Sequence, residues 1–455
     1  MTGGGAGRGG AGARGVVQAA AGVRLGLLVL LGFAAGAFPD FDESAGLPQA
    51  TCRGFGAARA AVGAGAPGPA ERALRALAVW DAVYFVRVCE CGYEQERFFA
   101  FFPGLPLAMR GLARPLASMF PALSLRATCS LAGLLLSFAA CVAAAAGLYR
   151  LGEVLLRDAG AARRAALLFC VNPASPFYSA AYTEAMFAAL TFWGLYFLFR
   201  PGEGRVTSFP SKLRRATTGD EARAVVLFMA AAAVRSNGAL LWAFLAARRL
   251  HGFVVLPALQ VGRSALVLAT EAALVLLPSV AFQVYGYTQL CSAGVEEPRP
   301  WCTERRLPSV YTFVQREYWE VGLFRYWQAK QVPNFLLAAP ALVLAALGTV
   351  HYLRRIPPAE CARFWLLGRR TPGRPARGML FTPEMAPFVL HWALLAAVAL
   401  LVMNIQVATR FLSACPALYW FVDTLRGQNR RWAFTFFLTY ALVGALAFAN
   451  FYPWT

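Results

Sequence analysis

The stretch CSLAGLLLSFAACVAAAAGLY, residues 129 to 149, carries no charged side chain and is long enough to cross a bilayer as a helix, which takes about 20 residues. Similar long apolar stretches recur at 16 to 38, 264 to 285, 333 to 353, 379 to 403 and 432 to 449. Over the whole chain of 455 residues, 58% are hydrophobic and 15% are charged, whereas soluble domains average about 25% charged residues. The sequence therefore predicts an all-α protein embedded in a membrane.

Shorter apolar stretches, interrupted by polar residues, lie between these spans. They cover residues 165 to 179, 184 to 199, 223 to 236, 238 to 250 and 409 to 422. Because lipid cannot satisfy free peptide groups, an interrupted helix at membrane depth must be buried in protein or line a cavity. We therefore expect about eleven transmembrane helices, with a cavity beside the interrupted ones.

The basic residues determine the orientation that the sequence predicts. If every stretch crosses the membrane, more than half of the 43 Lys and Arg residues fall in segments on one face, and the positive-inside rule assigns that face to the cytoplasm. The amino terminus then lies in the cytoplasm and the carboxyl terminus in the lumen. These segments account for most of the net charge of +20, so the sequence does not favour a nucleic-acid partner.

This topology divides the chain into four parts. Residues 1 to 15 are a Gly/Ala/Arg-rich tail that we expect to be disordered in the cytoplasm, and 16 to 38 form the first transmembrane helix. Residues 39 to 128 form a long luminal loop, and 129 to 455 form a multispanning domain. A cleaved signal peptide is an alternative for the first helix, because basic residues precede an apolar core that ends in small residues.

The luminal loop contains the first candidate for catalysis. Trp80 and Asp81 open an amphipathic stretch that Gly92 closes, which predicts a helix along the membrane surface. An acidic residue there can take a proton from a sugar hydroxyl, and we assign Trp80 and Tyr84 to substrate binding because aromatic rings stack on sugars. Asp81 is also an ordinary residue for a helix start, so a structural role is the alternative.

Further polar points interrupt apolar stretches near the luminal boundary. Asn172 and Glu184 flank the first, Arg235 and Asn237 belong to the second, and Arg410 belongs to the third. Charged residues inside spans usually face a partner or a cavity, and a guanidinium offers paired donors to phosphate oxygens. Helix capping near Glu184, and interhelical hydrogen bonding or snorkelling by the arginines, are the alternatives.

Cysteine and histidine residues show no pattern typical of a metal site. The ten cysteines lack zinc spacing and the three histidines lie far apart in the sequence, so we expect no bound metal. Cys291 and Cys302 bracket a polar segment on the luminal side. Because that compartment is oxidising, a disulfide between them is a hypothesis.

These motifs resemble those of the PIG-V family, which adds the second mannose to the glycosylphosphatidylinositol (GPI) anchor precursor. The resemblance runs in order from about residue 80 to the end of the chain. The matching motifs are WDAVYF (80–85), GY (92–93), AFFPG (100–104), NPA (172–174), YTE (182–184), RSNG (235–238), QVPNFL (331–336), QVATRF (406–411) and PWT (453–455).

The resemblance implies a polytopic GT-C glycosyltransferase fold in the endoplasmic reticulum membrane with a luminal active site. It implies dolichyl-phosphate mannose as donor, a GPI precursor bearing one mannose as acceptor, and an α-1,6 linkage in the product. Since the donor is β-linked and the product α-linked, it further implies a single inverting displacement with one base and no cofactor. By this analogy Asp81 is the base.

The other roles are assigned from polarity and position. Arg235 and Arg410 are expected to hold the departing dolichyl phosphate, while Glu184 and Asn172 orient sugar hydroxyls. Asn237 and Asn334, which lie within the matching motifs, complete the candidate substrate-binding residues.

Several alternatives stay open at this point. Asp40 and Asp42 form a D-x-D motif just after the first span and are a rival base site. A transporter would also have many spans and embedded arginines, but we find no internal repeat of the kind that transporters show. A lipid-binding subunit that serves a partner enzyme, or an enzyme that needs a partner subunit, is compatible with the sequence.

Overall fold

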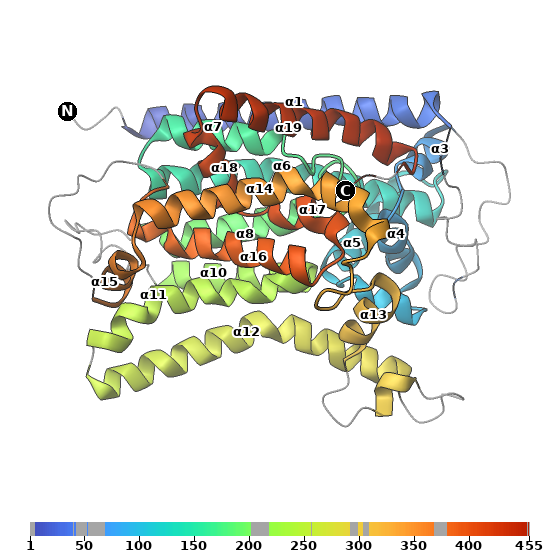
Figure 1. Cartoon of the computed structure of the whole chain (residues 1–455). Coiled ribbons are helices and arrows are strands. Elements are labelled where there is room, and N and C mark those ends of the chain that lie inside the picture. The colour runs from blue at the N-terminus through green and yellow to red at the C-terminus, as the bar shows by residue number, and fades with distance from the viewer. Residues whose placement is uncertain are drawn as a thin grey trace.

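The chain folds into a bundle whose long helices run roughly side by side (Figure 1). The structure is a computed structural model and describes residues 5–39, 41, 52, 69–201, 218–255, 257–291, 299–303, 309–367, 380–452 and 454. Within these residues the chain forms helices and turns but no strand. The prediction of an all-α protein is therefore confirmed, while the rival base site at Asp40 and Asp42 lies outside the described residues.

Among the residues that the structure describes, six helical segments are long and apolar enough to cross a membrane. Each coincides with one of the long stretches that the sequence predicts, so the multi-span architecture is confirmed. They are α1 (Gly5–Ala37), α6 (Leu125–Leu156), α12 (Ala258–Leu290), α14 (Val332–Arg355), α16 (Ala386–Leu401) and α19 (Gly427–Ala449).

The interrupted stretches form shorter helices. These are α7 (Ala159–Cys170), α8 (Thr183–Phe199), α10 (Thr218–Val234), α11 (Trp242–Val255), α17 (Ala408–Leu412) and α18 (Pro416–Thr424). Residues 171–182 after α7 form buried turns, and the 3-10 helix η3 (Ser236–Leu241) separates α10 from α11. The count of eleven crossings depends on these shorter pieces and stays a prediction.

The two ends of the bundle carry different segments (Figure 1). The helices α3 (Pro69–Ala76), α4 (Ala82–Cys91), α5 (Gly104–Met119) and α13 (Val310–Trp319) gather at one end, whereas α15 (Pro358–Leu367) lies at the other. Gly92 follows α4 at a φ of 81°, a conformation that glycine adopts without strain. The predicted helix between Asp81 and Gly92 is therefore confirmed.

The first helix begins earlier than the sequence analysis predicted. The helix α1 starts at Gly5, so it includes part of the tail that the sequence analysis assigned to residues 1 to 15. Alanine is the strongest helix former, and Ala13 and Val16 pack against the core of the bundle, so tertiary contact extends the helix beyond its most apolar part.

A buried arginine ties α1 to the turns that follow α7. Arg24 is 0% exposed, and its guanidinium donates hydrogen bonds to the Ser175 carbonyl (2.9 Å), the Ser175 hydroxyl (3.0 Å), the Ser179 hydroxyl (3.1 Å) and the Cys170 carbonyl. Non-helical backbone at membrane depth needs such internal donors. This bonding favours a permanent spanning helix over a removable signal peptide, because removal of α1 would leave these groups unpaired.

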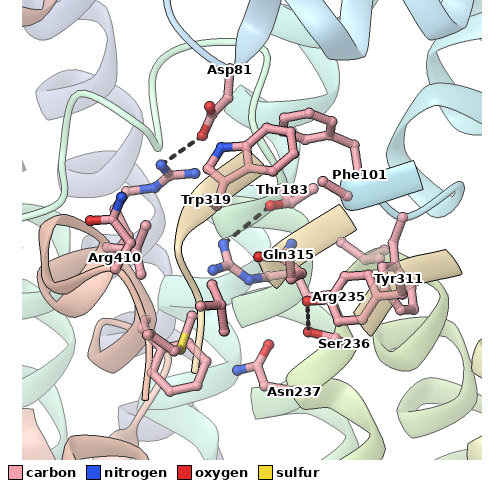
Figure 2. A pocket seen from close by; sticks show the side chains of 18 of the residues that line it. Asp81, Phe101, Thr183, Arg235, Ser236, Asn237, Tyr311, Gln315, Trp319 and Arg410 are labelled. Carbon is pink, nitrogen blue, oxygen red and sulfur yellow. Dashed lines mark hydrogen bonds and ion pairs between the residues drawn. The ribbon is translucent and has the colours of Figure 1, made fainter. Parts of the chain in front are cut away.

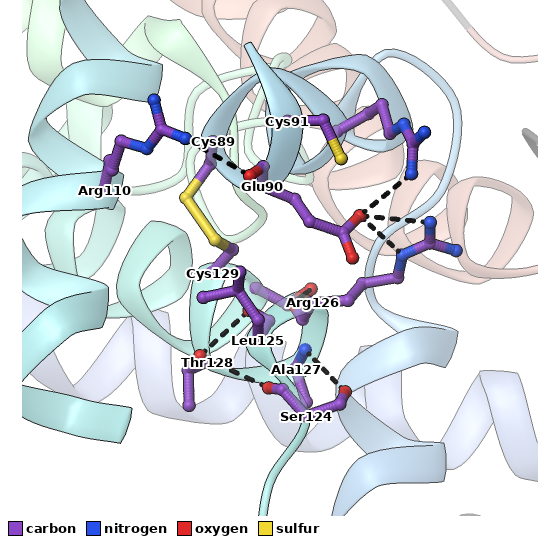
Figure 3. Close-up of a disulfide and its surroundings, with 12 residues drawn as sticks. Cys89, Glu90, Cys91, Arg110, Ser124, Leu125, Arg126, Ala127, Thr128 and Cys129 are labelled. Atoms are coloured by element: carbon purple, nitrogen blue, oxygen red, sulfur yellow. Dashed lines mark hydrogen bonds and ion pairs between the residues drawn. A yellow bond between two sulfur atoms is a disulfide. The ribbon is translucent and has the colours of Figure 1, made fainter. Parts of the chain in front are cut away.

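Three disulfides lie at the end of the bundle that carries α4, and Figure 3 shows the one between Cys89 and Cys129. Cys291–Cys302 confirms the pairing suggested by the sequence, whereas Cys52–Cys91 and Cys89–Cys129 were not predicted. Disulfides persist in oxidising compartments. The end with the disulfides is also the end that the basic residues assign to the lumen, so two independent patterns agree on the orientation.

Replacing Arg24 with Leu is expected to destabilise the protein, because buried carbonyl and hydroxyl groups near Ser175 lose their donor. Each unsatisfied buried group costs about 1 to 3 kcal/mol, so the free energy of unfolding should fall by at least that amount. Thermal unfolding in detergent, followed with a thiol-reactive dye at the buried free cysteines Cys141, Cys170 and Cys415, measures this. The control is Arg14→Leu, on an exposed position of the same helix, and equal melting of the two variants would contradict the role of Arg24.

Peptide mapping without reductant is expected to recover Cys89 and Cys91 in a peptide joined to both Cys52 and Cys129, and Cys291 joined to Cys302. The four remaining cysteines should react slowly with an alkylating agent in the folded protein and readily after denaturation. The reduced sample is the control. Free, alkylated thiols at Cys89 or Cys129 in the unreduced protein would show that α4 is not linked to α6.

Candidate active site

A cavity of about 130 Å³, open to the outside on one side, lies at the end of the bundle that carries the disulfides. Its lining comes from α4, the segment after η2 (Glu96–Ala100), the start of α8, η3, α13 and the turn before α17. Figure 2 shows that Asp81, Arg235 and Arg410 point toward this space from three different segments. The interrupted helices therefore border a cavity, as the sequence predicts.

Asp81 is the residue that precedes the first turn of α4. Its backbone N–H donates to the hydroxyl of Tyr182 (2.9 Å), and that hydroxyl donates to the carbonyl of Val79 (3.3 Å). Tyr182 is fully buried, so the start of α4 is fixed to the bundle. One Asp81 carboxylate oxygen accepts a hydrogen bond from Arg410 (2.8 Å), and the other has no partner among the described residues.

Glu184 holds the two arginines of the site. Its Oε1 atom accepts hydrogen bonds from Arg235 Nη1 (2.6 Å) and Arg410 Nε (2.7 Å), and its side chain is 1% exposed. The Arg410 guanidinium also lies over the rings of Phe177 (4.5 Å) and Tyr182 (4.9 Å). A carboxylate so deeply buried is tolerated only with such pairing, so these three side chains form one unit.

Two glycines allow the close backbone contacts that position Arg235. A Cβ atom on Gly238 would lie 2.5 Å from the backbone nitrogen of Ala232, and one on Gly104 would lie 2.8 Å from the carbonyl oxygen of Ala233. Real Cβ atoms do not approach backbone this closely. Gly238 therefore lets the chain turn tightly after α10, and Gly104 lets α5 pack against that turn.

The structure brings together five of the nine residues that the sequence analysis assigned. Asp81, Arg235, Asn237 and Arg410 line the cavity, and Glu184 lies directly behind both arginines. The Asn237 side chain is largely buried and makes no hydrogen bond to a described residue, so its amide is available inside the cavity.

Four assigned residues lie elsewhere. Asn172 is 0% exposed and uses its amide within its own turn, donating to Phe169 and accepting from Ala174. Its assigned role in orienting sugar hydroxyls does not fit this geometry, because both ends of the amide are occupied. Asn334 hydrogen-bonds Tyr326, Gln331 and Gln406 outside the cavity lining.

The two aromatic residues assigned to substrate binding also lie outside the lining. The ring of Trp80 packs against Phe451, while Tyr84 stacks on Phe101 at 4.7 Å and supports that cavity residue from behind. Phe85, four residues after Asp81, lines the cavity together with Asp81, whereas the neighbouring Tyr84 does not.

Sequence analysis missed the part of the lining that α13 supplies. Tyr311, Gln315 and Trp319 recur every four residues along this helix and line the cavity. That spacing is the available signal, since residues at i and i+4 share one face of a helix. The spacing alone does not reveal the site, because nothing in the sequence shows that this face of the helix lies near Asp81.

A potential metal-binding group lies apart from the cavity. Ligand atoms of Cys52, Cys91 and Glu94 lie within 4.8 Å of one another, but the two cysteines are joined as a disulfide. A metal would need their thiolates, so this group does not fit one.

Comparison with known proteins identifies the family. The sequence profile described as Mannosyltransferase (PIG-V) matches residues 43–455. The chain belongs to this family. A member of the PIG-V mannosyltransferase family is a glycosyltransferase, so the protein is an enzyme and the cavity around Asp81 is its candidate active site.

The relatives of the chain agree with this family. The chain is 34% identical to GPI alpha-1,6-mannosyltransferase 2 of Mus musculus and 33% identical to that of Homo sapiens, in each case over 85% of this chain and 89% of the relative. It is 34% identical to GPI mannosyltransferase 2 of Chaetomium globosum, over 91% of this chain and 90% of the relative.

Solved structures give a weaker similarity. The chain matches the oligosaccharyltransferase AglB of Archaeoglobus fulgidus with a TM-score of 0.42 and 14% identity, over 95% of this chain and 56% of that one. Similarity at this level carries no argument about the reaction, and the GT-C class stays a prediction from the PIG-V resemblance.

Replacing Glu184 with Gln is expected to lower the free energy of unfolding by about 3 kcal/mol, because Arg235 and Arg410 lose a buried counter-charge. The melting curve of the detergent-solubilised protein measures this. Glu221→Gln is the matched control, since Glu221 pairs with Arg249 but is 23% exposed and Arg249 keeps Glu271. The control should change the free energy of unfolding by less than about 1 kcal/mol. Equal losses of stability in the two variants would contradict the central role of Glu184.

Proposed function

We propose that this enzyme transfers mannose from dolichyl-phosphate mannose to a GPI precursor that already bears one mannose, forming an α-1,6 linkage on the luminal face of the endoplasmic reticulum membrane. The names of its relatives support the acceptor class and the linkage. The observation that carries the chemistry is Asp81, whose carboxylate has one oxygen open to a cavity that also holds two arginines.

The proposed reaction is one displacement at the anomeric carbon of the donor mannose. Asp81 takes the proton of the attacking acceptor hydroxyl, the new C–O bond forms, and the bond from the anomeric carbon to the phosphate oxygen breaks with its electron pair leaving on the phosphate. Attack from the face opposite the phosphate converts the β-linked donor into an α-linked product. One base is sufficient, because no covalent enzyme intermediate is formed.

The arginines are suited to the leaving phosphate. Arg235 uses only its Nη1 atom for Thr183 and Glu184, and its remaining N–H groups have no partner among the described residues. Arg410 likewise keeps its Nη2 atom free of described partners. Preorganised donors of this kind stabilise charge that develops in the transition state, and together with Asn237 they supply a phosphate-binding wall.

Binding of the donor would also affect the base. Arg410 bridges Asp81 and Glu184. A phosphate next to Arg410 shares its positive charge, so the hold of Arg410 on Asp81 weakens and the carboxylate becomes a better proton acceptor. Donor binding would thus activate Asp81 only when the leaving group is in place.

Replacing Asp81 with Asn is expected to leave the protein folded but to lower mannosyl transfer by roughly 100-fold or more, since an amide cannot accept the proton. Membranes from cells that lack this step, expressing each variant, are incubated with labelled dolichyl-phosphate mannose and a one-mannose acceptor. The two-mannose lipid is the readout, and these membranes supply any partner subunit.

The control for this experiment is Asp158→Asn. Asp158 accepts a hydrogen bond from Ala161 at the start of α7, and asparagine caps helices as well as aspartate does. Full activity of Asp81→Asn would refute the assignment of the base. Failure of the unmodified protein to form the two-mannose lipid would refute the proposed function, and transfer to a different lipid-linked acceptor would identify another dolichyl-phosphate-sugar-dependent transferase.

A further inference from the structure

The cavity has two walls of different chemistry. Arg235, Asn237 and Arg410 form the polar wall, whereas Phe101 and Trp319 form an aromatic wall. Figure 2 shows the Trp319 ring between Asp81 and Gln315, next to Phe101. The function proposed above uses the polar wall and Asp81 but gives the aromatic wall no task.

The aromatic wall is attached to the helix that carries the proposed base. Trp319 packs edge-on against Phe101 (5.7 Å) and Tyr84 (6.5 Å), and Tyr84 stacks on Phe101. Tyr84 lies about one turn after Asp81 on α4. The acceptor hydroxyl must come within hydrogen-bond distance of Asp81, so the sugar that carries this hydroxyl lies on the side of the aromatic wall.

Gln315 adds a polar group to this wall. It lies four residues before Trp319 on α13, so both side chains are on one face of the helix. The side-chain amide of Gln315 lines the cavity and makes no hydrogen bond to a described residue. A flat aromatic ring beside a free amide can bind a sugar, because the ring contacts the C–H face while the amide bonds the hydroxyls.

The aromatic wall is held in place by Glu96, which is largely buried beside it. The Glu96 carboxylate accepts hydrogen bonds from Trp301 Nε1 (2.7 Å) and the Tyr318 hydroxyl (3.2 Å). Partial burial and the Glu96 carboxylate raise the pKa of Tyr318, so the hydroxyl stays protonated as the donor. Trp319 directly follows Tyr318, and its position therefore depends on Glu96.

The other end of α13 is fixed as well. Gln283 of α12 accepts hydrogen bonds from the Ser309 hydroxyl (3.0 Å) and the Tyr311 backbone N–H (3.1 Å). The Tyr311 hydroxyl is 2.8 Å from that of Ser236, next to Arg235. With both ends anchored, α13 presents a preformed surface, which reduces the entropy lost when a ligand binds.

We propose that α13 forms the acceptor-sugar subsite, in which Trp319 stacks on the mannose of the GPI precursor and Gln315 hydrogen-bonds its hydroxyls. This inference rests on the proposed function and adds to it the residues that select the acceptor. Glu96 is a positioning residue in this scheme, because it acts through Tyr318 and Trp301 and does not line the cavity.

The test measures KM separately for the acceptor and for dolichyl-phosphate mannose in membranes that contain Trp319→Ala. Loss of the stacking surface is expected to raise the acceptor KM roughly tenfold, in line with other aromatic stacking contacts, while the donor KM changes by less than about twofold. Trp319→Phe keeps an aromatic ring, so its acceptor KM should lie between those of the unmodified protein and Trp319→Ala. A rise in the donor KM instead, or an unchanged acceptor KM, would overturn the proposal.

The matched control is Trp327→Ala. Trp327 lies in the same connection between α12 and α14, is 52% exposed and donates to the Leu400 carbonyl outside the cavity. Its replacement should leave both KM values unchanged. Equal increases in acceptor KM for the two tryptophan variants would show a general disturbance of this connection and would overturn the assignment of Trp319.

Glu96 gives a second test that leaves the cavity lining intact. Glu96→Ala is expected to raise the acceptor KM selectively, because α13 loses its anchor, and Glu96→Gln should restore a near-normal value because its amide oxygen still accepts a hydrogen bond. An unchanged acceptor KM in Glu96→Ala would refute the positioning role. The unmodified protein must form the two-mannose lipid in the same assay, so a failure there refutes the proposed function and is distinguishable from failure of this inference.

Discussion

The candidate active site depends on the pairing of the buried Glu184 carboxylate with two arginines. It accepts hydrogen bonds from Arg235, which follows α10, and from Arg410, which lies in α17, so it joins three segments far apart in the sequence. Charges buried in a membrane protein are tolerated when they are paired. The two arginines and two carboxylates of the site balance in charge, and the hydrogen bonds between them hold their side chains in fixed positions. The candidate site is therefore preorganised.

A second buried charge, that of Arg24, supports the site through the turns that follow α7. Arg24 holds the turns between Cys170 and Ser179, and the continuation of these turns carries Phe177 and Tyr182, the rings under Arg410. Irregular backbone at this depth needs a donor from elsewhere in the protein. A helix that looks like a simple anchor in the sequence thus takes part in positioning the candidate site, although it lies outside the cavity lining.

Sequence patterns predicted those features that depend on local periodicity or on a single unusual residue. The long spans, the helix ending at Gly92, and the embedded Arg235 and Arg410 all fall in this class. Asn172 was assigned to substrate binding from its polarity and position and Asn334 from its place in a matching motif, yet both amides bond neighbouring residues. The pairing of Cys89 with Cys129 and the approach of α13 to Asp81 join segments through the folded bundle, so no local pattern reveals them.

The length of α4 explains why these long-range contacts are needed. A helix of 10 residues is marginal on its own in water, and α4 has no long apolar stretch to bury it in lipid. Its start is bound to Tyr182 through the Asp81 backbone, and its end carries two disulfides, at Cys89 and Cys91. Most residues of α4 are also buried in the bundle. Bonds at both ends together with this burial therefore hold α4 in place, and they give Asp81 a fixed position beside the cavity.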